Sequence, residues 1–195
     1  RSIAYERINC IFEDRENNIW IGSNNNGLYR FNPEMQFFNN IAHTNRITNN
    51  PGKGSVLTVT PTRWGTYLTS TWGDGIYEYD KNFNQVPLSI KGIDYRTPSI
   101  WSACLSIDSN HIWMSGQPGI HVIDQKQKTF KSYYPPQLEN RTIRQIAEDK
   151  LGNLWLGMQG FGVFKWNAGE GKIKFDNGIH RFEKIPNAQV NKIMV

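Results

Sequence analysis

Several features are scarce in this sequence of 195 residues, and each scarcity narrows what the protein can be. No apolar run approaches the roughly 18 residues that a membrane-spanning helix needs, so we expect no membrane contact by this segment. The net charge of +5 is scattered, whereas nucleic-acid binding requires a concentrated basic stripe, so no nucleic acid is expected as a partner. The two cysteines leave the redox compartment undecided.

Residues suited to catalysis or to metal binding are also sparse. The four histidines show no metal-ligand spacing, and no nucleophile is accompanied by a base. The paired carboxylates Glu13-Asp14 and Glu148-Asp149 recur at the same point of two similar segments, which favours turn capping over acid–base chemistry. We therefore expect no catalytic residue, no metal and no cofactor, and the segment is not predicted to be an enzyme.

What the sequence does contain is a repeat. Residues 8–32 and 143–167 share one pattern: an apolar run, a turn with Asp and Asn, a run with Trp and Gly, a glycine turn and a third run. Three β-rich runs joined by two such turns predict a meander of antiparallel strands. Two weaker copies lie between, and the anchor aromatics of the four copies are Trp20, Tyr67, Trp113 and Trp155.

The steps between these aromatics, 47, 46 and 42 residues, are typical of propeller blades, which span about 40 to 50 residues each. No copy has a helical apolar stripe, and each ends in a fourth short aromatic segment, at 36–38, 81–83, 129–133 and 180–182. We predict an all-β fold: a β-propeller fragment of about four four-stranded antiparallel blades plus the first strand of a fifth.

The expected blades are residues 8–54, 55–98, 99–141 and 142–189, and residues 190–195 open the next one. This pattern favours a piece of a longer protein. A propeller closes by packing its last blade on its first, so an open arc leaves apolar faces and is expected to be marginally stable or self-associating. Cys10 and Cys104 then lie in first strands two blades apart, too distant for a disulfide.

The pattern of residues 143–167, Ile-x-x-Ile-x-Glu-Asp-x-x-Gly-Asn-Leu-Trp-Leu-Gly-x-x-x-x-Gly-Val-x-x-Trp-Asn with Arg144 as its second residue, resembles the two-component regulator propeller repeat. The likeness is strong at 8–32 and 143–167 and looser between, where Tyr67 stands for Trp and Thr69 for the following Gly. The resemblance implies a periplasmic sensor region of an inner-membrane protein. In that family, such regions signal to a histidine kinase and a response regulator by phosphorelay.

The resemblance also implies the partners. They are the remaining propeller blades and sensor modules of the same parent chain. A homodimer of the parent protein is a further partner that the resemblance allows. We predict a non-enzymatic, ligand-sensing segment that responds to oligosaccharides. Two alternatives remain: a propeller lyase or glycosidase, which needs two convergent carboxylates at the loop-rich end, and a protein-interaction scaffold, which needs a flat, apolar end.

The candidate binding residues lie in loops that a propeller gathers on one face, where binding usually sits. Trp72 lies in a glycine turn, Ser70 to Gly75, where there is little core for its side chain to fill. Aromatic side chains commonly bind sugars through the flat face of the ring. Phe161 and Asn25 occupy the comparable turns of the fourth and first copies. The remaining candidates, expected at the channel mouth, are Arg96, Trp101, Arg141 and Arg144.

Overall fold

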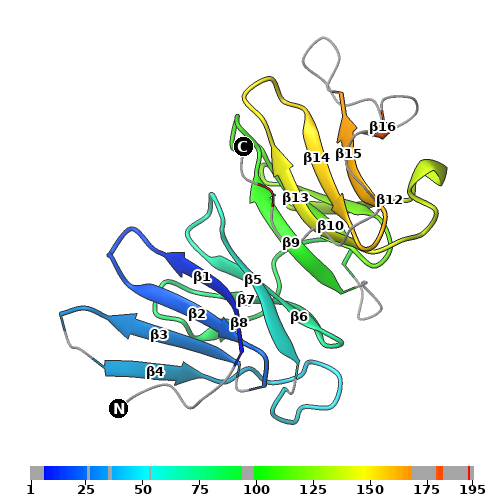
Figure 1. Cartoon of the computed structure of the whole chain (residues 1–195). Coiled ribbons are helices and arrows are strands. Elements are labelled where there is room, and N and C mark those ends of the chain that lie inside the picture. Colours follow the sequence, from blue (N-terminus) through cyan, green and yellow to red (C-terminus); the bar gives the residue numbers. More distant parts are fainter. Residues whose placement is uncertain are drawn as a thin grey trace. The chain divides into compact units, whose positions relative to one another are not determined.

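A computed structural model describes residues 7–25, 27–34, 37–52, 54–93, 99–167, 179–181 and 193, without the side chains of 37–39 and 179–181. The chain divides into two compact units. Unit 1 is Arg1–Ser89 with Asp94–Ser99, and unit 2 is Ile90–Ile93 with Ile100–Val195. Figure 1 shows unit 1 in blue to teal and unit 2 in green to orange.

Each unit contains two antiparallel sheets of four strands, and every sheet follows chain order as a meander. In unit 1, sheet I is β1 (Ile8–Glu13), β2 (Ile19–Ser23), β3 (Leu28–Asn32) and β4 (Phe37–Ile41). Sheet II is β5 (Ser55–Pro61), β6 (Tyr67–Trp72), β7 (Gly75–Tyr79) and β8 (Gln85–Val86).

In unit 2, sheet III is β9 (Ile100–Leu105), β10 (His111–Gly116), β11 (Ile120–Asp124) and β12 (Thr129–Tyr133). Sheet IV is β13 (Ile143–Glu148), β14 (Leu154–Met158), β15 (Gly162–Trp166) and β16 (Ile179–Arg181). Among the described residues the only helix is η1 (Pro136–Leu138), and no helix there is long and apolar enough to cross a lipid bilayer. The all-β class and the four four-stranded sheets are therefore confirmed.

The fourth strand of sheet II is not where the sequence predicted it. Residues 81–83 lie in a turn, and the strand begins at Gln85. The reason is Asp80, whose carboxylate accepts the backbone N–H groups of Asn82 and Asn84 at 2.8 and 2.9 Å. This local bond stabilises a tight turn, which a polar Asp-x-Asn-x-Asn segment prefers over a strand. The predicted opening of a fifth blade, residues 190–195, lies outside the described residues except for Ile193.

The turn between the first and second strands has the same design in all four sheets. Its first residue donates its N–H to the carbonyl that ends the turn, at 2.9 or 3.0 Å. These first residues are Asp14, Thr62, Ser106 and Asp149. In each case the side-chain oxygen accepts the N–H of the residue that ends the turn, so a short acceptor is needed at this position.

The two aspartates do more than cap the turn. Asp14 accepts the indole N–H of Trp20, and Asp149 accepts that of Trp155, each at 2.8 Å. Burial opposes the charge of Asp149, but hydrogen bonds from Asn153 and Trp155 outweigh it and lower the pKa of Asp149 to about 2. The structural role expected for these carboxylates is therefore confirmed: one side chain closes the turn and orients the anchor indole.

Tyr67 is not the equivalent of the anchor tryptophans. Counted from the turn, Thr62 corresponds to Asp149, so Leu68 occupies the position of Trp155 and Tyr67 the one before it. Because neighbouring strand residues point to opposite faces, Tyr67 lies on the other side of sheet II. There it stacks on Trp20 of sheet I, with ring centroids 5.8 Å apart.

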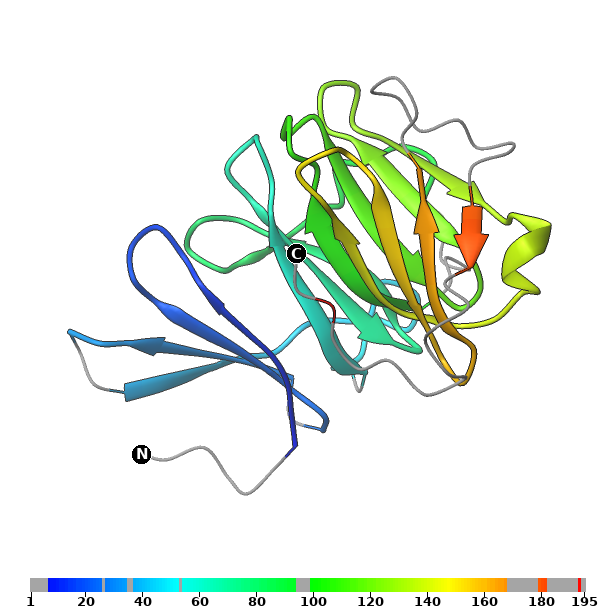
Figure 2. The same ribbon diagram turned by 45° about the horizontal axis from the view of Figure 1, so that its top comes forward.

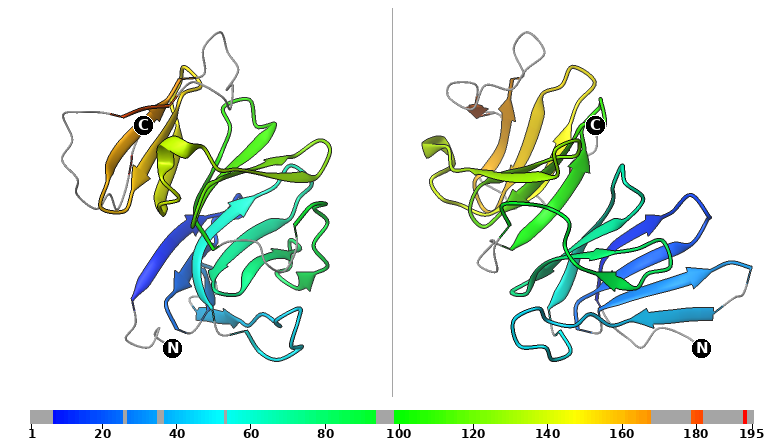
Figure 3. Two further views of the ribbon diagram at one scale, coloured as in Figure 1. Left: turned by 90° about the vertical axis from the view of Figure 1, so that its right-hand side faces the viewer. Right: turned by 180° about the vertical axis from the view of Figure 1, so that it is seen from behind.

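Within each unit the two sheets pack face to face through one apolar cluster. In unit 1 the cluster contains Trp20, Leu28 and Val56. In unit 2 it contains Trp113 and Val122 of sheet III and Ile143, Ile146 and Leu156 of sheet IV. Figures 2 and 3 show β13 alongside β9, the pair of strands that brings these two sheets together.

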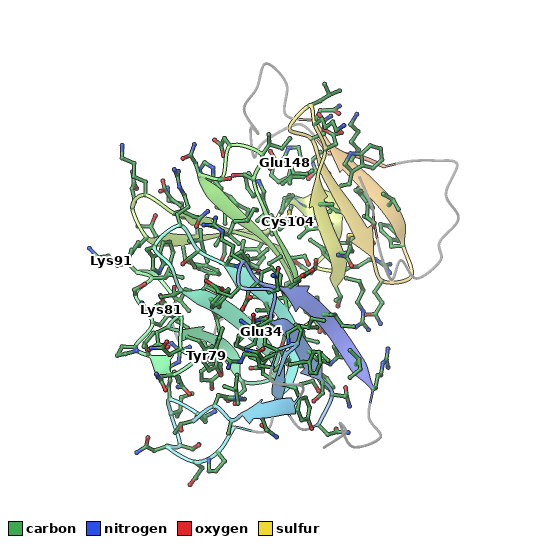
Figure 4. All side chains as sticks on the ribbon, turned by 90° about the vertical axis from the view of Figure 1, so that its left-hand side faces the viewer. Glu34, Tyr79, Lys81, Lys91, Cys104 and Glu148 are labelled. Atoms are coloured by element: carbon green, nitrogen blue, oxygen red, sulfur yellow. The ribbon has the colours of Figure 1, made fainter. Side chains whose placement is uncertain are left out.

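Glu148 links sheets III and IV at their turn end. Its Oε2 accepts the backbone N–H of Ile107 at 3.0 Å and the indole N–H of Trp113 at 3.2 Å, both from sheet III. Sheet III has Ser106 where sheet IV has Asp149, so the next sheet supplies the carboxylate that Trp113 bonds. Figure 4 labels Glu148 beside Cys104, whose pKa burial and the Glu148 charge raise to about 12.

His121 on β11 is a completely buried imidazole. Its Nδ1 lies 2.9 Å from the hydroxyl of Ser132, and its ring stacks on Phe130 with centroids 5.3 Å apart. Burial lowers the pKa of His121 to about 4, and the carbonyl of Pro118 offsets only part of that effect. The folded protein therefore holds this histidine neutral.

Replacing Glu148 with Ala should destabilise unit 2. The variant leaves a backbone N–H and an indole N–H without their acceptor, and losing hydrogen bonds to a charged group costs about 1–3 kcal/mol. Denaturant unfolding checks the change in the free energy of unfolding. Glu34→Ala is the control, because Glu34 is exposed in a turn and its loss should cost less than about 0.5 kcal/mol. Equal effects of the two substitutions would refute the link.

His121 should make the folded state sensitive to mild acid. Its folded pKa of about 4 lies below the ordinary 6.5, so its contribution is complete above pH 6.5 and is lost as pH falls from 6.5 towards 4. Near pH 5 the loss should approach about 2 kcal/mol, from about 1.4 kcal/mol for each pH unit. Unfolding at pH 7.5 and pH 5 checks this, and His121→Gln should remove most of the difference.

Candidate functional site

Unit 1 carries a hollow of about 630 Å³ between the loop that follows β4 and the turn that joins β6 to β7. Figure 3 shows this cyan loop lying beside the end of β6. The loop contributes Asn45, Thr48, Asn50, Pro51, Gly52 and Gly54, and the turn contributes Trp72, Gly73 and Asp74. The lining thus combines amide, hydroxyl and backbone groups with one large aromatic side chain.

Asp74 fastens the loop to the turn. Its Oδ2 lies 2.8 Å from Nε2 of His43, and its Oδ1 accepts a hydrogen bond from the side-chain amide of Asn45. The side chains of His43 and Asp74 are only 4% and 10% exposed. A buried carboxylate needs such donors, because an unpaired charge out of water is costly.

The loop also closes on itself. Asn45 accepts the N–H groups of Ile47 and Thr48 on its side-chain oxygen, and its own N–H bonds the carbonyl of Asn50. Gly52 donates its N–H to the carbonyl of His43 at 2.8 Å. A Cβ at position 52 would lie 1.8 Å from Nε2 of His43, so only glycine lets the returning strand pass the imidazole.

Tyr77 and Arg46 pack next to His43 without lining the hollow themselves. The ring of Tyr77 lies 4.4 Å from that of His43, and the Arg46 guanidinium carbon lies 5.2 Å above the Tyr77 ring. Burial, then the charge of Asp74 and a hydrogen bond to it, raises the pKa of Tyr77 to about 12. Tyr77 therefore stays neutral near pH 7.

Trp72, predicted from the sequence as a binding residue, lines this hollow. Gly73 and Gly75 adopt φ of +79° and +88°, which a β-branched or bulky residue would not tolerate, and they turn the chain sharply after Trp72. Trp72 is 57% exposed, whereas Leu68, Tyr77 and Tyr79 of the same sheet are buried.

The other candidate in unit 1 lies in a different turn. Asn25 accepts a hydrogen bond from the side-chain amide of Asn24 at 3.1 Å, and the Asn24 carbonyl accepts one from Ser55. Neither asparagine is among the residues that line the hollow. Arg96 lies outside the described residues.

The four candidates in unit 2 stack on one another in pairs. The Arg144 guanidinium carbon lies 3.8 Å from the Trp101 ring centre, and that of Arg141 lies 4.1 Å from the ring of Phe161. The Nε atoms donate to side-chain oxygens of Gln159 and Glu139, at 3.0 and 3.1 Å. Packing thus uses one face of each guanidinium, and no described cavity joins the two pairs.

Sequence reasoning missed His43, Asn45 and Asp74. His43 and Asn45 lie 31 and 29 residues before Asp74 in sequence, and they meet it only because the loop folds back on the turn. Asp74 is the one carboxylate among the described lining residues, and no group of three metal-binding side chains occurs in the described part of the chain. The site as described offers a stacking surface and polar groups.

Comparison with known proteins agrees with the repeat pattern. A family model described as two component regulator propeller matches residues 2–25 and 137–160. No relative was found among curated protein sequences.

Solved structures show the same fold at low sequence identity. The extracellular domain of a putative hybrid two component system from B. thetaiotaomicron is 20% identical with a TM-score of 0.67, over 89% of this chain and 24% of that one. The extracellular domain of a putative one component system from the same organism is also 20% identical, with a TM-score of 0.66, over 87% of this chain and 21% of that one. PorZ of the type-IX secretion system of Porphyromonas gingivalis is 14% identical, with a TM-score of 0.61, over 88% of this chain and 27% of that one. The chain thus spans about a quarter of each of these structures.

Replacing Asp74 with Ala should release the loop from the turn. The variant leaves His43 and Asn45 without their shared acceptor, and breaking a buried, hydrogen-bonded pair costs about 3 kcal/mol. Amide hydrogen exchange should accelerate roughly a hundredfold over residues 43–52, as expected when local stability falls by that amount. The strands of sheet IV serve as the internal control, and unchanged protection of the loop would show that Asp74 does not hold it.

Proposed function

We propose that this chain, which carries two copies of the two-component regulator propeller repeat, is a ligand-sensing segment of an extracytoplasmic sensor region in the periplasm. Its matches to the repeat model and its likeness to extracellular domains of two-component systems support that setting. The kinase and response-regulator modules to which such a region signals belong to the proposal for the parent protein.

The ligand we propose is an oligosaccharide that binds in the hollow of unit 1. The observation that carries this is Trp72, an exposed aromatic residue that lines the hollow together with polar side chains. A sugar ring has an apolar C–H face and an edge of hydroxyl groups. The indole supplies a flat apolar surface for the first, and Asn45, Thr48 and Asn50 supply donors and acceptors for the second.

The hydrogen bonds that hold the loop suit recognition. The bonds from His43 and Asn45 to Asp74 fix the loop, so little conformational freedom is lost when a ligand binds. A binding site becomes a sensor only if the ligand favours one arrangement of the protein over another. The loop that follows β4 links sheet I to sheet II, so a ligand held between this loop and the β6–β7 turn bears on both sheets of unit 1.

Glycoside cleavage has less support. A glycosidase needs two carboxylates about 5–10 Å apart, and both oxygens of Asp74 already accept hydrogen bonds from the loop. We therefore place binding ahead of catalysis for this hollow.

Titration calorimetry with a panel of neutral and acidic oligosaccharides tests the proposal. A sugar that binds should lose about 2 kcal/mol, roughly thirtyfold in affinity, with Trp72→Ala, because the variant removes most of the apolar contact. Trp72→Phe keeps an aromatic face and should retain more of the affinity.

The control is Tyr134→Ala in unit 2, which removes an aromatic side chain that is 50% exposed and lies outside the hollow. Equal losses for Trp72→Ala and Tyr134→Ala would show that the sugar binds elsewhere. Release of shorter sugars during the titration would support the enzyme, and no heat across the panel would favour the protein-interaction scaffold.

A further inference from the structure

We propose that Asn50 selects the sugar that the hollow of unit 1 binds, by pairing its carboxamide with two neighbouring hydroxyl groups of one sugar ring. This role of Asn50 rests on the sugar-binding function proposed above. It narrows the ligand class to oligosaccharides with a unit whose two adjacent ring hydroxyls are both unsubstituted.

The polar side chains that line the hollow differ in how far their hydrogen-bonding groups are already used. Both oxygens of Asp74 accept hydrogen bonds from the loop. The side-chain oxygen of Asn45 accepts two backbone N–H groups, and its amide nitrogen donates to Asp74. The hydroxyl of Thr48 accepts the N–H of Asn50 at 3.4 Å. The exposed carboxamide of Asn50, in contrast, has no hydrogen-bond partner among the residues that the structure describes.

The backbone of Asn50 is nevertheless held in place. Its carbonyl accepts the N–H of Asn45 at 2.8 Å, and the Asn45 side chain is bonded to Asp74 in the turn. Pro51 follows and forms a β-bridge with the other end of the loop, and a residue before proline is restricted to extended conformations. The loop therefore presents an unpaired side chain from a fixed backbone, so little freedom is lost when Asn50 binds a ligand.

The hollow has room for a sugar ring next to Trp72. Gly73, the next lining residue, has no side chain, and a Cβ built there would meet no described atom within 4 Å. Trp72 and Asn50 line the same hollow, one from the turn and one from the loop. A ring that contacts the indole can therefore turn its hydroxyl edge towards Asn50.

A carboxamide is chemically matched to a pair of neighbouring hydroxyl groups. Its oxygen accepts and its nitrogen donates on one edge, and each sugar hydroxyl can do both. One hydroxyl of the pair then donates to Oδ1 of Asn50 while the other accepts from Nδ2. A sugar that lacks either hydroxyl, or is linked through it, leaves one of these amide groups unpaired, and such sites discriminate against the analogue without the hydroxyl.

Titration calorimetry with the oligosaccharide of highest affinity in the panel tests this role. Asn50→Ala should weaken binding roughly tenfold, because two neutral hydrogen bonds are lost. The bonds of Asn50 within the loop run through its backbone, so the variant keeps them. Asn49→Gly is the matched control: Asn49 is the exposed neighbour, does not line the hollow and has φ of +59°, which glycine adopts freely. This control should bind like the unchanged chain.

Monodeoxy analogues of the same oligosaccharide test the pairing itself. In the unchanged chain, removal of either of two hydroxyls on neighbouring carbons of one ring should weaken binding about fivefold, the effect of one neutral hydrogen bond. Asn50→Ala should bind these two analogues as well as it binds the parent sugar, because groups in direct contact are energetically coupled.

The outcomes separate the role of Asn50 from the sugar-binding function. Affinity that falls with Trp72→Ala but not with Asn50→Ala would overturn the role of Asn50 and leave sugar binding intact. Sensitive hydroxyls that are not neighbours, or equal losses in the unchanged chain and Asn50→Ala, would also overturn it. A panel without any binding sugar would overturn both. Amide hydrogen exchange over residues 43–52 shows whether Asn50→Ala keeps the loop folded; if protection falls, the deoxy series in the unchanged chain decides.

Discussion

The hydrogen bonds at the first turn of each sheet are the constraint on which much of the described structure depends. A tight turn leaves N–H groups that have no carbonyl partner on a neighbouring strand. The indole N–H of an anchor tryptophan adds one more donor near the same point. Asp14 and Asp149 satisfy their own turn and their own tryptophan. Glu148 instead serves the preceding sheet, since it bonds Ile107 and Trp113. The adjacent acids Glu148 and Asp149 thus act in two directions: Asp149 stabilises the turn of sheet IV, and Glu148 joins sheet IV to sheet III.

Sheet II shows how the same requirement is met without an aspartate. Thr62 caps the turn, and the indole of Trp64, inside that turn, bonds Glu78 on β7 at 2.7 Å. Burial alone would raise the pKa of Glu78, but donors from Ser89, Trp64 and Thr66 lower it below the usual range. In sheet II the acceptor of the indole N–H therefore lies on β7, the third strand, and not in the turn.

The fold was predictable from the sequence because its signals are local. The Asp-to-Trp spacing, the glycine turns and the alternating runs each act within a few residues, so they indicated the meander and the four sheets correctly. The errors arose where aromatic residues were matched by type. Tyr67 was aligned with Trp20, although the turn that begins at Thr62 places Leu68 at that position. Phe83 suggested a strand at 81–83, but the bonds from Asn82 and Asn84 to Asp80 make a turn there.

The site was predictable only in part. A tryptophan in a glycine turn has no core to enter, which is why Trp72 could be expected at the surface. The loop that faces Trp72 could not be predicted. His43 and Asn45 contact Asp74 across about 30 residues, and no repeating pattern in the sequence indicates that contact. Trp101, Arg141 and Arg144 were expected at the channel mouth and Phe161 in a turn, and their role in binding stays a prediction. Composition alone could not show that the arginines stack on the aromatic rings.

The residue before the turn cap differs from sheet to sheet, and this makes the sheets non-interchangeable. The position holds Glu13, Pro61, Leu105 and Glu148 in turn. At the end of the first strand of sheet IV, Glu148 accepts N–H groups from sheet III, whereas the proline and the leucine at the same position of sheets II and III offer no acceptor side chain. Exchanging the order of the four sheets would therefore separate Glu148 from the N–H groups of Ile107 and Trp113. The order of the sheets is therefore fixed in part by the residue that ends each first strand. Four identical repeats would not specify this order.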